Sequence, residues 1–299
     1  MRYPRGFGVP LRLIAVSFLW ALCYPLIETA GHAVPLLHLA AARAGIAGAS
    51  LLALAAVLGR WRVTGPGVWT TLSGIGLFAT SLGFLGMFRA GEFVSPGIAT
   101  VVNDAQPLLA SLIAWQVLRE RPSGLGWGGL LLGLGGIVIV ASPQLAGEST
   151  VAGYFFVLLG AAGVAAGNVL MKRLPSVIDP AAAMGWQLML GCIPLAVAAA
   201  ILEPTPNLAA IQGLAGTVLV LAIVGTAIPF AIWFSVLRST PLVKANAYTF
   251  LTSVFGLAIG AIFFRERLTW LQLLGVGVTL LGVHLAQRSA SHRAPTPAG

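Results

Sequence analysis

Two residues of opposite charge stand inside long apolar stretches of the chain. Arg43 lies about nine residues into a stretch that begins near residue 34, and Asp104 lies equally far into one that begins near residue 95. A charge placed at the centre of a membrane-spanning helix costs about 2.5–3.5 kcal/mol, so it normally faces a cavity and has a partner. We expect the two residues to pair or to bind a zwitterion jointly. The alternative is that Arg43 extends to the membrane surface while Asp104 accepts a structural hydrogen bond.

Aromatic and polar side chains at helical spacing accompany these charges. Trp20 and Tyr24 are four residues apart and share a helix face, and Phe230 and Trp233 are three apart. An apolar pocket with a few convergent polar groups is the usual small-ligand site, although such aromatic residues also serve plain packing. The candidate substrate-binding residues are Trp20, Tyr24, Arg43, Phe78, Asn103, Asp104, Asn168, Trp186, Gln187, Phe230, Trp233, Asn246 and Tyr248.

Three prolines inside the apolar stretches are candidate gating residues, namely Pro25, Pro107 and Pro229. Proline removes a backbone hydrogen bond and bends a helix, so it creates a place where the helix can flex or line a cavity. Prolines are also frequent in membrane helices without any such role.

No pattern in the sequence predicts catalysis, a metal site or a cofactor. The acidic residues lie mostly at predicted loops, the four histidines are dispersed, and the two cysteines form no metal or redox motif. The phosphate-binding pattern GxxxxGK[ST] is missing from the sequence, and the net charge of +9 forms no basic patch of the kind that binds nucleic acid. We therefore expect a protein that is not an enzyme; an intramembrane enzyme is a remote alternative.

Membrane-spanning helices must position these residues. Of the 299 residues 58% are hydrophobic and only 8% are charged, against about 25% charged residues in soluble domains. Apolar stretches recur that are long enough to cross a hydrocarbon core of about 30 Å, and in lipid such stretches form helices. The predicted spans are 12–32, 34–58, 67–88, 95–118, 124–142, 151–171, 179–203, 212–236, 241–264 and 268–287.

Charges in the short loops predict the direction of these spans. Loops that stay in the cytoplasm are enriched in Lys and Arg. If both termini are cytoplasmic, every Lys and Arg falls on that side except Arg43, Arg89, Arg265 and Arg267. The sequence therefore predicts a multi-pass protein of a bacterial inner (plasma) membrane, with its N-terminus and C-terminus inside.

The sequence repeats itself at an offset of about 146 residues. Each copy contains five predicted helices, an odd number, so the second copy enters the membrane in the opposite direction. Inverted repeats are typical of secondary transporters, whose substrate site lies near the midplane between the copies. The matching residues are Arg119, Glu120 and Arg121 with Arg265, Glu266 and Arg267; Gly129 and Gly136 with Gly275 and Gly282; Thr80, Phe84 and Phe88 with Thr226, Phe230 and Phe234; and Ser95 and Pro96 with Thr240 and Pro241.

Each half of the chain resembles an EamA domain of the drug/metabolite transporter superfamily. The resemblance rests on the duplicated Arg-Glu-Arg turn, the glycines seven residues apart, Arg43, and the Ser-Pro or Thr-Pro pair before spans 4 and 9. It implies an all-α membrane protein of ten transmembrane helices, built as two inverted five-helix repeats around a central cavity. Helices 1–4 and 6–9 would line that cavity, with helices 5 and 10 at the periphery. Relatives in this superfamily export amino acids, and a YddG-type branch exports aromatic ones.

The predicted organisation has five parts: a cytoplasmic N-terminus (1–11), a first repeat (12–142), a periplasmic linker (143–150), a second repeat (151–287) and a disordered cytoplasmic tail (288–299). We expect a secondary transporter that exports small metabolites, foremost amino acids and among them aromatic ones, by alternating access. The alternatives are an exporter or importer of another substrate class. Protons are a candidate coupling ion through Asp104, with flow down the substrate gradient as the alternative. Because one chain holds both repeats, a monomer in the lipid bilayer suffices.

Overall fold

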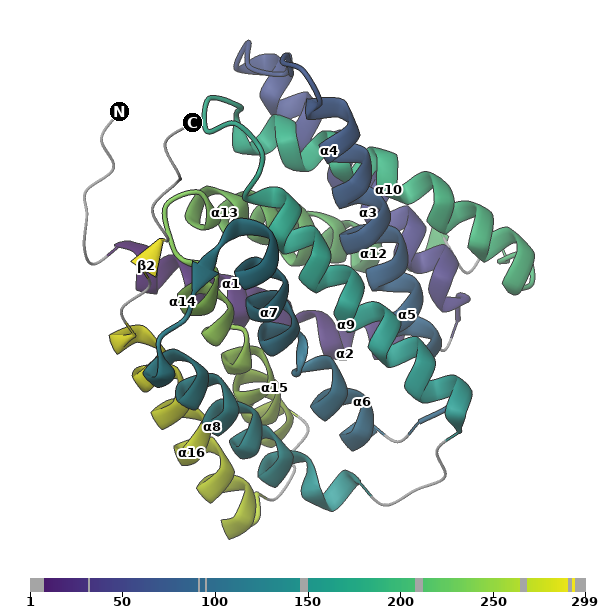
Figure 1. Ribbon diagram of the computed structural model, residues 1–299. Helices are drawn as coiled ribbons and strands as arrows, with labels where there is room; N and C mark the ends of the chain where they lie inside the picture. The colour runs from purple at the N-terminus through teal and green to yellow at the C-terminus, as the bar shows by residue number, and fades with distance from the viewer. Residues whose placement is uncertain are drawn as a thin grey trace.

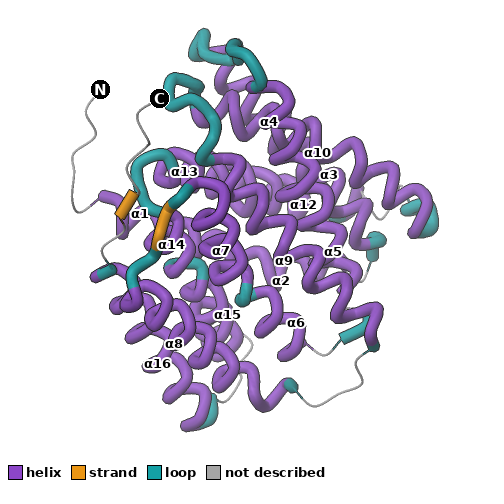
Figure 2. Tube along the Cα trace, in the orientation of Figure 1, coloured by secondary structure: helices purple, strands orange, loops and turns teal. Residues whose placement is uncertain are grey.

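The computed structural model describes residues 8–31, 33–90, 92–94, 96–145, 150–207, 212–263, 268–289 and 292–293. Over these residues the chain is almost entirely helical, and one short antiparallel pairing joins strand β1 (Glu120–Arg121) to β2 (His292–Arg293) (Figures 1 and 2). The predicted tail therefore contains one paired segment, next to the Arg119–Arg121 turn. The matching Arg265–Arg267 turn lies outside the described residues.

The helices of the first half of the chain are α1 (Gly8–Ala21), α2 (Cys23–Gly31), α3 (Leu36–Val57), α4 (Val68–Ile75), the π-helix η1 (Gly76–Leu82), α5 (Gly83–Ala90), α6 (Pro96–Asn103), α7 (Gln106–Leu118), α8 (Gly124–Ala141) and the short 3₁₀ helix η2 (Ser142–Gln144). Those of the second half are α9 (Val151–Met171), α10 (Pro180–Leu202), α12 (Ala215–Ala222), the π-helix η3 (Ile223–Ala227), α13 (Ile228–Leu237), α14 (Leu242–Ala247), α15 (Phe250–Phe263) and α16 (Trp270–Arg288).

The described residues contain nine helical stretches that are long and apolar enough to cross a membrane. The predicted fourth span corresponds to α6 and α7, where the helix stops at Asn103 and resumes at Gln106. Three polar residues at this break, Asn103, Asp104 and Gln106, make the segment less apolar than the other nine. The protein is thus an all-α membrane protein of about ten helices, as predicted.

The two halves interrupt their helices at matching places. The π-helices η1 and η3 lie about 146 residues apart, and so do the break after α6 and the break between α14 and α15. Segments of π-helix inside α-helices widen one turn and are frequent at functional sites. The repeat seen in the sequence is therefore also a repeat of irregular backbone at the middle of spans 3, 4, 8 and 9.

Contacts between helices follow a twofold pattern. Helix α3 packs along α10, and α8 packs along α16, so each helix meets its counterpart from the other repeat (Figure 1). Helices α5 and η1 pack on α9, just as α13 packs on α1. Such reciprocal contacts arise when two repeats are related by a twofold axis in the membrane plane. We call the face at which α1 begins the terminal face, and the face at which α3 begins the distal face.

The pairing of α8 with α16 depends on glycines that let two backbones touch. A Cβ atom added at Gly136 would lie 2.5 Å from the backbone nitrogen of Thr279 and 2.7 Å from the carbonyl oxygen of Gly275. A Cβ added at Gly282 would lie 2.4 Å from the nitrogen of Gly133. Small residues in membrane helices permit this close approach, and the resulting dispersion contacts hold the helices together. The two spans form a seam away from the centre of the molecule, at the lower left of Figure 1.

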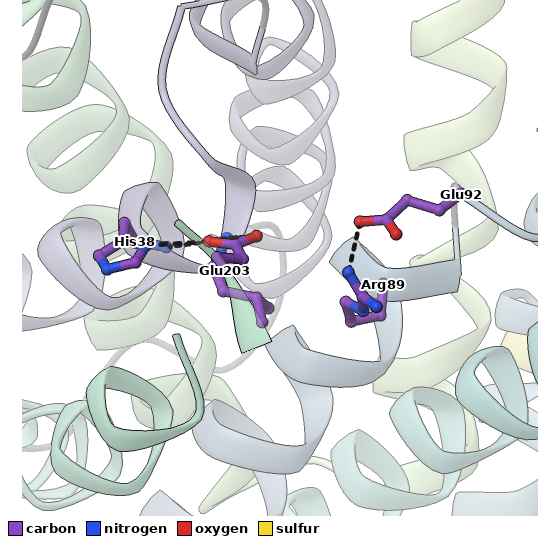
Figure 3. A network of polar contacts seen from close by, with 5 residues as sticks. His38, Arg89, Glu92 and Glu203 are labelled. Atoms are coloured by element: carbon purple, nitrogen blue, oxygen red, sulfur yellow. Dashed lines mark hydrogen bonds and ion pairs between the residues drawn. The ribbon is translucent and has the colours of Figure 1, made fainter. Parts of the chain in front are cut away.

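The α3–α10 pair is fastened at both ends. At the distal face, Glu203 accepts hydrogen bonds from the backbone nitrogens of Leu37 (2.8 Å) and His38 (3.1 Å), and its carboxylate lies 3.0 Å from Nδ1 of His38 (Figure 3). At the terminal face, Asp179 caps α10 through the backbone nitrogen of Ala181 (2.9 Å) and lies 3.7 Å from Arg60. These contacts satisfy donors that a helix start leaves free. The pair should therefore move as one unit.

Replacing Glu203 with Ala should lower the free energy of unfolding by about 1–3 kcal/mol, because two backbone N–H groups and His38 lose their acceptor in a part-buried place. Replacing Glu92 with Ala is the matched control. Its ion pair with Arg89, also drawn in Figure 3, is more exposed, and such pairs contribute under about 1 kcal/mol. Thermal unfolding of the purified protein in detergent measures both. Equal losses from the two variants would contradict this account of the α3 start.

Candidate functional site

A cavity of about 350 Å³ lies between the two repeats. Ligand pockets for small molecules measure roughly 300–1,000 Å³, so a single small metabolite fits. Its walls come from spans 1–4, 6, 8 and 9. They include the breaks in spans 4 and 9, at Asp104 and Thr249. The lining residues are Trp20, Cys23, Tyr24, Ile27, Leu36, Arg43, Ala79, Phe84, Met87, Phe88, Asn103, Asp104, Gln106, Val164, Asn168, Met171, Phe230, Trp233, Thr249 and Thr252.

The cavity extends toward the distal face. Ile27 and Leu36 lie at the distal ends of α2 and α3, and Met87 lies near the distal end of α5. On the other side, Met171 is the last residue of α9 and Trp233 lies in the terminal half of its span. Both are almost fully buried. The cavity therefore has its floor in the terminal half of the membrane and its mouth toward the distal face.

Arg43 reaches the cavity wall from α3 and is held by neutral groups. Its Nε donates to Oγ1 of Thr226, and its Nη2 donates to the carbonyl oxygen of Gly225 at 3.3 Å and lies 3.8 Å from Sγ of Cys23. The guanidinium also lies over the ring of Phe84, 5.1 Å from the centroid. Among the described residues Arg43 forms no ion pair, and Nη1 has no hydrogen-bond partner. One side of a buried cation is therefore available to a ligand.

Asp104 lies at the break between α6 and α7, and a neutral group holds it too. Ser253 of α15 donates from Oγ to Oδ2 of Asp104 at 2.6 Å. Within the described part of the chain, Oδ1 has no partner and Asp104 forms no ion pair. Arg43 and Asp104 thus line one cavity but do not contact each other. Of the two arrangements expected for them, direct pairing is not the one in this structure.

Aromatic rings form the floor and one wall of the cavity. Trp20 packs against Trp233 with ring centroids 5.5 Å apart and against Phe230 at 6.1 Å. The indole nitrogen of Trp233 donates to Oδ1 of Asn168 at 2.9 Å, which fixes the ring in place. Such rings offer a large apolar surface with a fixed geometry. The cavity thus combines separated charges with an aromatic surface.

Eight of the thirteen predicted binding residues line this cavity: Trp20, Tyr24, Arg43, Asn103, Asp104, Asn168, Phe230 and Trp233. The other five lie outside it. Phe78 of η1 is partly exposed on the outside of the bundle, and Trp186 packs on Trp69 with its indole nitrogen bonded to the carbonyl oxygen of Trp61. Gln187, Asn246 and Tyr248 are buried between helices.

These three buried residues form hydrogen bonds between spans of the bundle. Gln187 accepts a hydrogen bond from Thr80, and Asn246 accepts one from Asn168 at 3.5 Å. The carbonyl oxygen of Tyr248 accepts from Ser17 at 2.8 Å. Their polar atoms therefore tie neighbouring spans together, and Asn246 and Asn168 connect α14 to the cavity floor.

The candidate gating prolines all lie where helices change geometry. Pro25 is in the first turn of α2, after the interruption at Leu22. Pro107 is in the first turn of α7, directly after the break at Asp104, and Pro229 is in the first turn of α13, directly after the π-helix η3. Proline is tolerated at a helix start because the missing N–H would be unpaired there anyway. The three prolines therefore lie at interruptions of their spans, and their role in gating stays a prediction.

Three polar residues of the cavity were not among the predicted site residues, namely Gln106, Thr249 and Thr252. The side-chain nitrogen of Gln106 and the hydroxyl of Thr252 are buried without a hydrogen-bond partner in the described part of the chain. Buried polar atoms are rarely left unpaired, so both point to a ligand or water. The signal in the sequence was that each follows another polar residue inside an apolar span. Gln106 comes two residues after Asp104, and Thr252 comes three after Thr249. Apolar wall residues such as Leu36 and Met87 carry no such signal.

The described residues hold no cluster of three or more His, Cys, Asp and Glu that could bind a metal ion. Comparison with known proteins adds the decisive observation. Residues 8–142 and residues 151–287 each match the EamA-like transporter family. The chain belongs to this family.

Several relatives share nearly the whole EamA-type chain. An uncharacterized transporter of Synechocystis is 30% identical over 92% of this chain and 88% of its own length. A probable amino-acid metabolite efflux pump of Escherichia coli is 28% identical over 94% of both chains. A solved crystal structure with 20% identity has a TM-score of 0.78 and covers 94% of this chain and 96% of that one, which shows that the fold is shared. The protein is a membrane transporter of the EamA type.

Proposed function

We propose that this protein is a secondary transporter that exports zwitterionic metabolites, foremost amino acids with apolar or aromatic side chains, by alternating access. The observation that carries the proposal is that Arg43 and Asp104 line one cavity and that neither forms an ion pair among the described residues. The free side of Arg43 can bind a carboxylate, and Oδ1 of Asp104 can accept from an ammonium group. Charged hydrogen bonds of this kind contribute about 1.5–3 kcal/mol each. The rings of Trp20, Phe230 and Trp233 offer a surface for an apolar side chain.

Other observations agree with this proposal. The distribution of Lys and Arg favours an orientation with both termini in the cytoplasm, and we place the protein in a bacterial inner membrane. The name of the Escherichia coli relative is that of a probable amino-acid metabolite efflux pump. One chain holds both repeats, so we propose that a monomer is a sufficient unit. Asp104 is the candidate site for a coupling proton, because it is the one carboxylate among the described residues that line the cavity.

Efflux from proteoliposomes tests the proposal. Vesicles holding the purified protein are loaded with a mixture of labelled amino acids, and release is followed with and without an imposed proton gradient. We expect selective and saturable release of apolar or aromatic amino acids, with protein-free vesicles as the control. A rate that depends on the gradient in the parent but not in Asp104→Asn would support proton coupling. The absence of release for every amino acid, with folded protein, would contradict the proposed substrate class.

A further inference from the structure

A buried ion pair joins the two repeats below the cavity floor. Glu120 follows α7 at the terminal face, and its Oε1 accepts from Nζ of Lys172, the residue that follows α9. Its other oxygen, Oε2, accepts from the backbone nitrogen of Leu242 at 3.0 Å, at the start of α14. Lys172 also donates to the carbonyl oxygen of Thr240 at 2.9 Å. One carboxylate of the first repeat thus ties the end of span 6 to the start of span 9.

The ion pair is shielded from solvent. The side chains of Lys172 and Glu120 are only 8% and 9% exposed. A buried pair of this kind holds its partners strongly, because removing either one leaves an uncompensated buried charge. If both partners move into water together, the hydration of the two charges compensates for the lost ion pair. The contact is therefore strong when closed and can be broken by a movement that hydrates both groups.

Both segments that the pair holds lead directly to the cavity floor. Lys172 is the next residue after Met171, which lines the floor. Helix α14 runs from Leu242 to Ala247 and presents Asn246 to Asn168, which in turn binds Trp233. Helix α14 then ends at the break before α15. Because α14 is short and interrupted, it can move without the rest of its span.

We infer that Glu120 and Lys172 form the gate that closes the cavity toward the terminal face, and that their separation opens it. The cavity has its mouth toward the distal face, and Met171 of its floor is followed directly by Lys172 of this pair, so parting the segments that the pair joins would connect the floor with the terminal face. Glu120 is a positioning residue, since it acts through α14 and α9 and does not line the cavity. The inference concerns the pathway and holds for any substrate.

Glu203 offers a matched comparison within the same chain. It is also a buried carboxylate that binds the backbone nitrogens at a helix start, in this case α3. It fastens α3 to α10, a pair that is held at both ends and has no interruption in the described residues. Its loss should weaken the protein without opening either side of the cavity. Comparing the loss of Glu120 with the loss of Glu203 therefore distinguishes a gate from a contact that only stabilises the fold.

Cysteine labelling from each side of the membrane tests the gate. In a Cys23→Ala/Cys192→Ala background, one reporter is placed at the floor (Met171→Cys) and another at the mouth (Met87→Cys). A membrane-impermeant maleimide is added to the terminal or the distal side of sealed vesicles. In Glu120→Ala and in Lys172→Met, we expect labelling of the floor reporter from the terminal side to rise about tenfold, as a shift in population between two states would produce. Labelling of the mouth reporter from the distal side should not rise.

The controls distinguish a gate from general loosening. Glu203→Ala should leave the terminal-side labelling of the floor reporter within about twofold of the parent, although the protein is less stable. Should the Ala variant of Glu120 fail to fold, Lys172→Met gives the result alone, because it leaves the contact between Glu120 and Leu242 in place. Unchanged floor labelling in folded protein would overturn the inference. So would an equal rise at both reporters or an equal effect of Glu203→Ala. None of these readouts uses a transported amino acid, so a wrong substrate class would leave the test intact.

Discussion

Replacing Arg43 with Gln is expected to lower the apparent affinity for a transported amino acid by about 10- to 100-fold. The guanidinium is buried and paired only with neutral groups, and its Nη1 is free among the described residues. A charged hydrogen bond to a substrate carboxylate contributes about 1.5–3 kcal/mol, and each 1.4 kcal/mol corresponds to a factor of ten. Concentration dependence of efflux from proteoliposomes measures the change. Asp104→Asn should have an effect of similar size through the ammonium group.

Modified substrates distinguish the roles of the two charges. The parent should discriminate against an amino-acid amide, which lacks the carboxylate, and against an N-acetyl amino acid, which lacks the ammonium group. Arg43→Gln should lose mainly the first discrimination, and Asp104→Asn mainly the second. Arg89→Gln is the control, because Arg89 pairs with Glu92 near the distal face and does not line the cavity. Normal transport by the double variant Arg43→Gln/Asp104→Asn would refute zwitterion recognition.

Replacing Gly136 with Leu should prevent stable folding, with an expected loss of more than about 4 kcal/mol. Its Cβ would lie within 2.5 Å of the backbone nitrogen of Thr279, and backbone atoms on α16 cannot rotate away as a flexible side chain can. Relief of the clash therefore requires the two helices to separate along their whole seam. The measurement is the fraction of monodisperse protein in detergent, together with its unfolding temperature.

The neighbouring glycine gives a matched control for this variant. A Cβ added at Gly135 meets nothing within 4 Å, so Gly135→Leu makes the same chemical change one residue away on the same helix. That variant should keep the parental unfolding temperature to within a few degrees. Comparable instability of both variants would mean that loss of glycine itself, and not the closeness of α8 and α16, is responsible.

The two repeats differ in the contact that each π-helix makes with the other repeat. Thr226 in η3 accepts from Arg43 of α3, and the matching Thr80 in η1 donates to Gln187 of α10. Both contacts tie a π-helical turn to the second span of the other repeat. Only the contact with Arg43 faces the cavity, while Gln187 is fully buried. The equivalent contacts thus carry a charged side chain in one case and a neutral amide in the other, and only the charged one lies on the cavity wall.

The sequence by itself determined the membrane fold and the repeat, and it singled out two charged residues as candidates for the site. Stretches of this length and apolarity must cross lipid as helices, and an odd number of helices in each copy must invert the second copy. Arg43 and Asp104 were expected to face a cavity because hydrocarbon does not tolerate an isolated charge, and the structure places both on the wall of one cavity. These conclusions depend on solvation energies that act on each segment wherever its neighbours lie.

The tertiary structure alone decided which residues meet. A membrane helix that is apolar on all sides has no hydrophobic face to fix its rotation, so its sequence does not show which residues point inward. Trp186 and Gln187 lie outside the cavity because α10 packs tightly on α3 and η1, where a Cβ at Gly76 would lie 2.6 Å from the carbonyl oxygen of Gln187. Arg43 and Asp104 do not meet, and their hydrogen-bond partners Thr226 and Ser253 come from other spans. Rotation and partner choice follow from packing between distant segments, and no single segment encodes that packing.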